Sequence, residues 1–188
     1  KKKIPIPDAN PKRIVDLTKR SVDFVKEQAG RRPFFLMLSH YSVHVPHQAS
    51  PKAIERCRRR WLAAGRPDVD RSKPGYEQTD TYQQWQYSAM LEETDESLGS
   101  IIDALEETGQ LDNKVVVFRG DHGERLGDHG IYLKGPHFYE EAVRVPLAMS
   151  WPGHFQNDMR AEGLTELVDL APTLLDSAGL SVPEAMQG

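Results

Sequence analysis

Three stretches of the chain carry apolar residues at helical spacing. Over residues 13–29 the apolar positions recur every three or four residues, and Gly30 follows as a stop signal. A longer repeat of the same kind runs from residue 79 to about residue 107, and Gly109 closes it. A third pattern spans residues 169–178. Each stretch predicts a helix with one apolar face.

Three short apolar runs predict buried strands. They lie at residues 34–39, 115–118 and 145–151, and the second is rich in β-branched valine. Helical and strand patterns therefore alternate along the chain, without an internal repeat. Such alternation is typical of an α/β fold in which helices cover a sheet.

The segment from residue 40 to about residue 78 breaks this alternation. Prolines and glycines interrupt it repeatedly and no period is sustained, apart from a short helical pattern near residues 51–64. Loops of this length are usually functional or act as lids. We therefore expect a long excursion from the core that carries one short helix.

Composition narrows the class of protein. The 188 residues suit one domain, and no run approaches the roughly 20 apolar residues of a membrane span. The single cysteine, Cys57, excludes an internal disulfide and leaves the compartment open. The chain begins with lysines at positions 1–3, and no targeting leader can be read from it.

Charge is uneven along the chain, whose net charge is -4. Residues 1–60 are basic, and the densest run is Arg56 followed by residues 58–60. This run lacks the interleaved stacking aromatics or recognition motif of nucleic-acid readers. We expect a solvated basic face and no nucleic-acid partner.

Most histidines cluster in two short windows, each just after a predicted strand. The first window holds His40, His44 and His47, and the second holds His122, His129 and His137. In open α/β sheets, ligands bind beyond the carboxyl ends of the strands. We therefore expect the two windows to meet at one edge of the sheet.

Asp121 and His122 are candidate metal ligands. They follow the strand at residues 115–118, and Gly120 and Gly123 permit the sharp turn that would let both side chains face one cation. Carboxylate oxygens favour Ca²⁺, Mg²⁺ or Mn²⁺, and imidazole widens the choice to Mn²⁺ or Zn²⁺. At least two further ligands must come from elsewhere.

Two other segments carry candidate anion-binding groups. Lys134 stands among glycines and is a compact cation suited to the oxyanion of a sulfate or phosphate ester. In the segment from His44 to His47, Pro46 rigidifies two imidazoles, one of which could donate a hydrogen bond to a leaving or nonbridging oxygen.

Several of these segments resemble the sulfatase family of the alkaline-phosphatase-like superfamily. The resemblance is carried by residues 121–130 (DHGERLGDHG), by Lys134-Gly135-Pro136 and by residues 139–147 (YEEAVRVPL). The His44-Val45-Pro46-His47 segment and residues 168–175 (VDLAPTLL) are also similar to family segments. The resemblance runs from about residue 13 to Gly188.

This resemblance implies a fold and a site. It implies a layered α/β/α sandwich with a mostly parallel or mixed sheet. Asp121 and His122 would bind a divalent cation, most often Ca²⁺, with Mg²⁺ or Mn²⁺ as alternatives. His44 and Lys134 would hold the sulfate of a sulfated carbohydrate or aryl sulfate and assist departure of the alcohol. The resemblance favours an extracytoplasmic place, whether periplasmic, secreted or lysosomal.

The family's nucleophile has no counterpart in this sequence. Family members use a formylglycine made in a Cys/Ser-x-Pro-x-Arg motif, which is absent here, and Cys57 lacks the proline of that motif. The family's N-terminal Asp-Asp metal pair is missing too. We expect residues 1–188 to be the later half of a catalytic domain, with the nucleophile in a preceding part and no sulfatase turnover by this chain alone.

Two other functions remain open at this point. A phosphonate monoester or phosphodiester hydrolase of the same superfamily would use the same cation, lysine and histidine. A non-catalytic module could instead bind sulfated glycans through the basic N-terminal third. No motif in residues 40–78 selects a sugar, steroid or choline ester, and no pattern indicates an oligomeric state.

Overall fold

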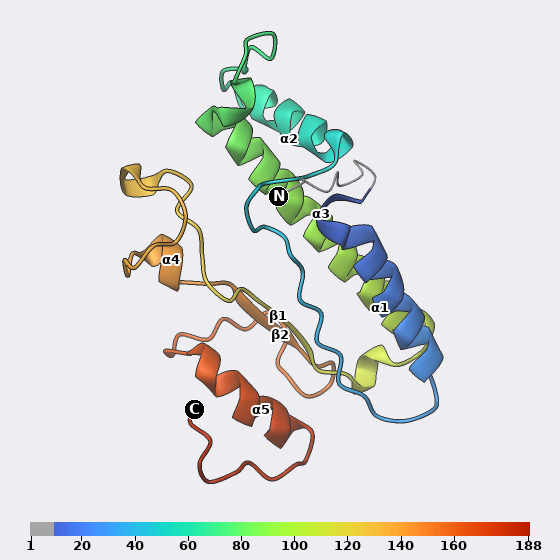
Figure 1. Cartoon of the computed structure of the whole chain (residues 1–188). Coiled ribbons are helices and arrows are strands. Elements are labelled where there is room, and N and C mark those ends of the chain that lie inside the picture. The colour runs from blue at the N-terminus through green and yellow to red at the C-terminus, as the bar shows by residue number, and fades with distance from the viewer. Residues whose placement is uncertain (1–9) are drawn as a thin grey trace, which may run out of the picture. The chain divides into compact units, whose positions relative to one another are not determined.

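A computed structural model describes residues 10–188, which form two compact units (Figure 1). Unit 1 contains the described residues up to Leu111 together with Leu126–Tyr132. Unit 2 contains Asp112–Arg125 and Leu133–Gly188. The lysines at positions 1–3 lie outside the described residues.

Unit 1 is built on three helices. They are α1 (Ile14–Gln28), α2 (Pro51–Ala63) and α3 (Asp80–Glu107), and both α1 and α2 pack along α3 (Figure 1). The helices predicted at residues 13–29, 51–64 and 79–107 are therefore confirmed.

Local signals explain why these helices begin where they do. The Ser50 hydroxyl accepts a hydrogen bond from the Ala53 amide (3.2 Å) at the start of α2, and Pro51 occupies the first helical position. The Thr79 hydroxyl accepts one from the Tyr82 amide (3.4 Å) at the start of α3. Each cap satisfies an amide that the helix itself leaves without a partner.

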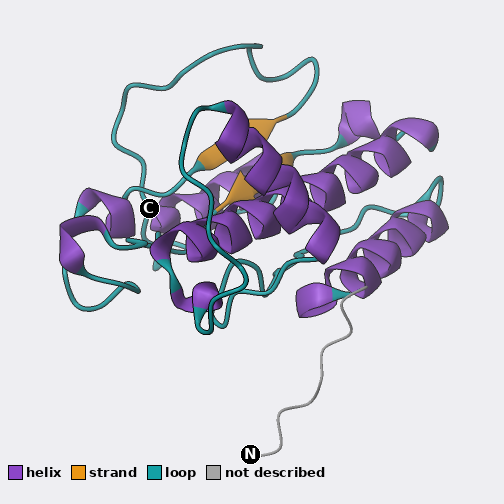
Figure 2. Cartoon of the chain, turned by 90° about the horizontal axis from the view of Figure 1, so that it is seen from above, coloured by secondary structure: helices purple, strands orange, loops and turns teal. Residues whose placement is uncertain are grey.

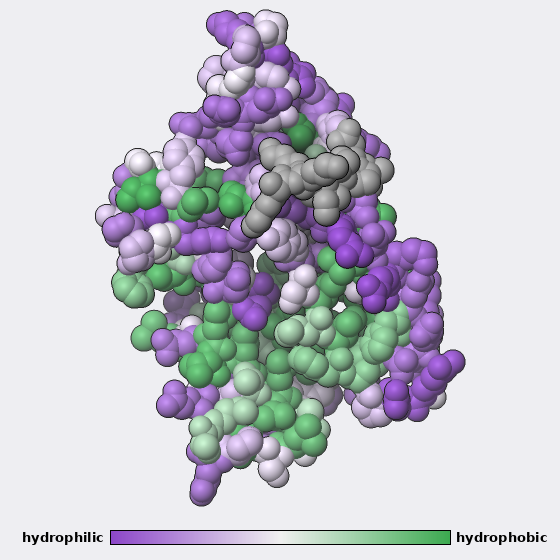
Figure 3. Space-filling view, viewed as in Figure 1, coloured by the Kyte–Doolittle hydropathy of each residue, from purple (hydrophilic) through white to green (hydrophobic). Residues whose placement is uncertain are grey.

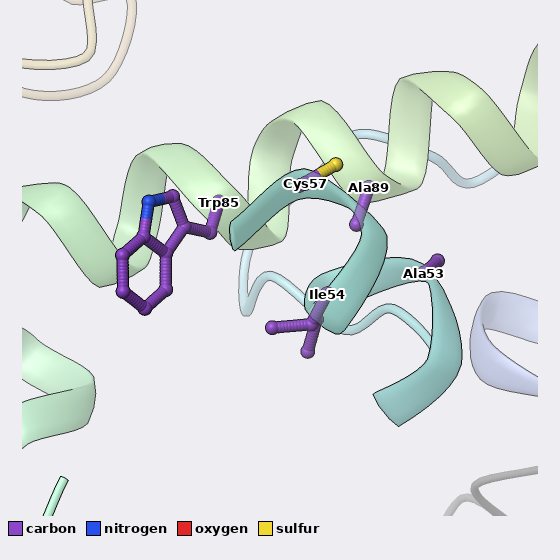
Figure 4. Packing of buried hydrophobic residues seen from close by; sticks show 5 residues of the cluster. All are labelled: Ala53, Ile54, Cys57, Trp85 and Ala89. Carbon is purple, nitrogen blue, oxygen red and sulfur yellow. The ribbon is translucent and has the colours of Figure 1, made fainter. Parts of the chain in front are cut away.

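One cluster of buried residues in unit 1 lies between α2 and α3. Figure 4 shows the five buried residues of this cluster, which are Ala53, Ile54 and Cys57 on α2 and Trp85 and Ala89 on α3. Both alanines are fully buried, so the two helices approach closely around the Trp85 indole, which is 1% exposed. Burial of a side chain of this size contributes on the order of 2–3 kcal/mol to stability.

Ion pairs border this core and neutralise much of the basic run on α2. The Glu92 carboxylate on α3 accepts hydrogen bonds from Arg56 and Arg60, and Arg56 also reaches Glu96 (2.8 Å). Burial opposes ionisation of Glu92, but the hydrogen bonds from Arg60 and Arg56 outweigh it and lower the pKa of the carboxyl. The run predicted as a solvated basic face is thus largely ion-paired within unit 1.

A chain of hydrogen bonds joins α1 and α3 to His40. The Thr18 hydroxyl donates to the Ile14 carbonyl (2.7 Å), so it must accept from the Ser97 hydroxyl (2.6 Å). The Ser97 hydrogen is then committed, and Ser97 can only accept from His40 Nε2 (3.2 Å). In neutral His40 the buried Nδ1 then carries only a lone pair, and it has no partner.

Unit 2 contains one pair of strands and two helices. The strand β1 (Val116–Arg119) pairs antiparallel with β2 (Leu147–Ser150), and the pair is drawn in orange in Figure 2. In this register Arg119 lies opposite Leu147. The helices are α4 (Glu140–Val143) and α5 (Leu170–Ser177). The strands predicted at residues 115–118 and 145–151 and the helix predicted at residues 169–178 are confirmed.

Short 3-10 turns complete the described elements. They lie at Pro11–Arg13, Tyr76–Gln78, Leu111–Asn113, Asp128–Gly130 and Leu167–Asp169.

The prediction of a strand at residues 34–39 is wrong. This segment is extended, and its side chains alternate between half-buried and exposed, with Phe35 75% and Met37 70% exposed. No other described segment pairs with it in a ladder. An apolar run supplies β propensity, but a strand also needs a partner for its backbone groups. On the face of the molecule drawn in Figure 3, apolar residues (green) gather at the surface.

Burial lowers the pKa of His40, and this makes the stability of unit 1 depend on pH. Below about pH 6.5 the unfolded chain binds a proton at this position more readily than the folded one. The stabilisation is therefore complete above about pH 6.5 and falls as pH drops toward the lowered native pKa. For one group, the slope of the unfolding free energy cannot exceed about 1.4 kcal/mol per pH unit.

We expect His40→Gln to flatten this slope, because glutamine cannot take up the proton. Urea unfolding between pH 8 and pH 5 measures it. His154→Gln, which removes an exposed histidine, should keep the wild-type slope. Equal slopes in the wild type and His40→Gln would contradict the assignment.

Candidate functional site

The segment that leaves β1 is held against α4 by a close backbone approach at Gly123. Its amide donates to the Ala142 carbonyl (2.8 Å). A Cβ atom at residue 123 would lie only 1.9 Å from the Glu141 carbonyl oxygen. Glycine is therefore required here by space, and the approach fixes the residues immediately before it.

Asp121 and His122 are neighbouring side chains whose lone pairs are available to a metal ion. His122 Nδ1 lies 2.9 Å from the Gly123 carbonyl, which can only accept, so Nδ1 carries the hydrogen. In the neutral ring, Nε2 then has a free lone pair, and it lies 3.6 Å from Asp121 Oδ2. The Asp121 side chain is 76% exposed. This tautomer and exposure suit two ligands of one cation.

The pair is not a complete metal site. Among residues 10–188, no three His, Cys, Asp or Glu side chains gather closely enough to hold a metal ion. The two side chains fit part of a divalent-cation site, and their role as metal ligands stays a prediction. The remaining ligands have no counterpart in the described part of the chain.

Lys134 occupies a tight turn in the same unit. Leu133 and Gly135, on either side of it, both have positive φ (66° and 58°), which is the left-handed region. The Arg125 guanidinium lies beneath this turn and donates from Nε to the Leu133 carbonyl (2.8 Å). No hydrogen bond or ion pair joins the Lys134 ammonium to another described residue, so it is available to an anion.

His44 belongs to unit 1. It is exposed, and its Nδ1 lies 2.7 Å from the Val45 carbonyl, whereas its Nε2 makes no hydrogen bond to another described residue. His47 is held differently, because its Nδ1 lies 2.9 Å from the Gln83 Oε1 atom of α3. Of the two imidazoles in this segment, His44 is the one available to a ligand.

The structure thus distributes the four predicted site residues between the units. Asp121, His122 and Lys134 lie in unit 2, with the first two in direct contact, whereas His44 lies in unit 1. The meeting of the two histidine windows at one sheet edge stays a prediction. Sequence reasoning missed Arg125, because its position within a motif gave no sign that a charged side chain would be buried.

Comparisons with known proteins indicate a family. A family model described as Sulfatase matches residues 8–180. The N-acetylglucosamine-6-O-sulfatase of Bacteroides thetaiotaomicron is 38% identical over 109 residues, which are 57% of this chain and 19% of that protein.

Solved structures agree in fold. A putative sulfatase from Bacteroides fragilis has a TM-score of 0.77 at 30% identity. The phosphonate monoester hydrolase from Silicibacter pomeroyi has a TM-score of 0.75 at 26% identity. Each match covers 93% of this chain and 39% of the other. These likenesses confirm the predicted α/β class and the alkaline-phosphatase-like fold, and this chain spans less than half of each of the three proteins named here.

No helix in residues 10–188 is both long and apolar enough to span a membrane.

The close approach at residue 123 predicts a large effect of a single methyl group. We expect Gly123→Ala to destabilise the protein by about 2–4 kcal/mol, because the Glu141 carbonyl already fills the space of the new Cβ. Urea unfolding measures the loss. Gly163→Ala is the matched control, since nothing lies within 4 Å of its Cβ position, and it should change stability by less than about 1 kcal/mol. Similar midpoints for the two variants would refute the constraint.

Proposed function

Because the chain belongs to the sulfatase family, we propose that it forms part of a hydrolase that cleaves sulfate monoesters. Asp121 and His122 bind the divalent cation, most often Ca²⁺, and Lys134 and His44 act on the sulfate group. The observation that carries the proposal is the Asp121–His122 pair, whose tautomer leaves Nε2 free beside an exposed carboxylate.

Each residue has a distinct part in breaking the ester S–O bond. When bound, the cation supplies positive charge to the sulfate oxygens. Lys134 adds an ammonium that no other described side chain neutralises, and it holds a sulfate oxygen as charge develops. His44, as the imidazolium, keeps its Nδ1–H on the Val45 carbonyl and donates Nε2–H to the departing alcohol oxygen.

The nucleophile belongs to sequence beyond these 188 residues in this proposal. The family uses a formylglycine, and the motif that forms it is absent here. Cys57 does not substitute for it, because its side chain is buried and burial raises the pKa of the thiol. An extracytoplasmic place is proposed on the family resemblance.

A second activity is supported by one comparison. The phosphonate monoester hydrolase from Silicibacter pomeroyi is similar to 93% of this chain. A cation, a lysine and a histidine would serve a phosphonate or phosphodiester as well as a sulfate ester, since each is a tetrahedral anion. Comparing turnover of an aryl sulfate with that of an aryl phosphonate separates the two.

A glycan-binding module is less well supported. Arg56, Arg58 and Arg60 are each committed to carboxylates of unit 1, which leaves Arg59 as the member of this run without a described ion pair. A polyanion would have to compete with these internal pairs.

We expect Lys134→Met and His44→Asn each to lower kcat on 4-nitrophenyl sulfate by about 10²- to 10³-fold, because each removes a group that stabilises the departing charges. The measurement uses the complete polypeptide, with any sequence encoded before Lys1 and after Gly188. Arg160→Met, which removes an exposed cation from unit 2, should keep wild-type turnover. Near-normal activity of Lys134→Met would rule out its proposed role.

Removal of the cation should abolish this activity. In Asp121→Asn, recovery of the activity should need more added cation than in the wild type. We expect the variant, after EDTA treatment, to need about tenfold or more Ca²⁺ for half-maximal turnover, because one carboxylate charge is lost. Asp176→Asn, at an exposed position of α5, is the control and should titrate as the wild type. An unchanged Ca²⁺ requirement in Asp121→Asn would exclude it as a ligand.

A further inference from the structure

Arg125 is the most deeply buried charged side chain that the structure describes. It is 1% exposed and lies in unit 2 with the candidate site. Its Nε donates to the Leu133 carbonyl (2.8 Å). Its guanidinium carbon lies over the Tyr139 ring, 6.0 Å from the ring centroid. A Cβ atom at Gly135 would lie 2.7 Å from one terminal nitrogen. The guanidinium therefore touches the residues on both sides of Lys134.

This burial does not favour stability. Among the described residues no carboxylate lies within ion-pair distance of Arg125, and its buried Nη1 donates to no atom. A buried charge without a counter-ion and a buried donor without an acceptor are both unfavourable. An apolar side chain of similar length would avoid both penalties.

The geometry gives this arginine a place in the site. Arg125 follows Asp121 and His122 by a few residues and reaches across to the turn that carries Lys134. The Nε of its planar guanidinium holds the Leu133 carbonyl by a hydrogen bond. One terminal nitrogen of the same group fills the space where a side chain at Gly135 would begin. The turn between these contacts has little freedom to move relative to the segment that carries the metal-binding pair.

We propose that Arg125 is a positioning residue that sets the place of the Lys134 ammonium relative to Asp121 and His122. This inference rests on the proposed function of Lys134. Arg125 acts through the backbone of the turn and does not itself contact the substrate. A displacement of about 1 Å in a reacting group is enough to change a rate by about 10²-fold, so loss of the contact should reduce turnover while the fold persists.

The test is a double-substitution cycle in the complete polypeptide, with any sequence encoded on either side of this chain. Arg125→Met should lower kcat on 4-nitrophenyl sulfate by about 10- to 100-fold and leave the thermal midpoint unchanged or higher. Arg125→Lys keeps a donor for the Leu133 carbonyl and should recover part of the loss. In a Lys134→Met background, Arg125→Met should cause little further loss, because its effect passes through Lys134.

Other outcomes overturn the inference. If the losses of the two substitutions multiply, or if kcat falls only in proportion to a loss of folded protein, Arg125 has a structural role alone. If Lys134→Met lowers turnover and Arg125→Met does not, the positioning inference fails and the proposed function stands. If Lys134→Met turns over normally, the proposed role of Lys134 fails first.

Backbone ¹⁵N relaxation gives a readout that does not depend on turnover. In Arg125→Met, the NMR order parameters of the amides of residues 133–135 should fall below their wild-type values, whereas those of α5 should be unchanged. Unchanged order parameters at residues 133–135 would overturn the inference even if the protein showed no sulfatase activity.

Discussion

The contact between Gly123 and α4 is the constraint on which the candidate site depends. The Glu141 carbonyl stands where any side chain at residue 123 would begin, so the chain that leaves β1 can lie against α4 only at a glycine. The Asp121–His122 pair comes just before this point, and Arg125 follows just after it. A single backbone approach thus sets where the donor pair faces solvent and where the arginine enters the interior.

The helices were predictable because their signals are local. Apolar spacing, the Ser50 and Thr79 caps and Gly109 all lie within or beside the elements that they define. The run at residues 34–39 carried an equally strong strand signal but formed none. Strand formation depends on partners that are distant in the sequence, and β1 and β2 have each other whereas this run has no described partner.

The sequence identified candidate site residues, but it could not predict their burial or their hydrogen-bond partners. The resemblance to the sulfatase family pointed to Asp121, His122, Lys134 and His44, and the structure leaves atoms of each available. Spacing could not separate His44 from His40, although the two share one window. His40 is bound to Ser97 within unit 1, and His44 is exposed. Burial and hydrogen-bond partners arise from non-local packing, and the same reason hid Arg125.

The core between α2 and α3 gives the protein a built-in reporter. Cys57 is the only cysteine of the chain, and its sulfur lies beneath α2, 3.3 Å from Arg60 and 3.7 Å from Glu92. A thiol reagent can reach this atom only when α2 separates from α3. The rate of labelling therefore reads out the local opening of these two helices, separately from any event in unit 2.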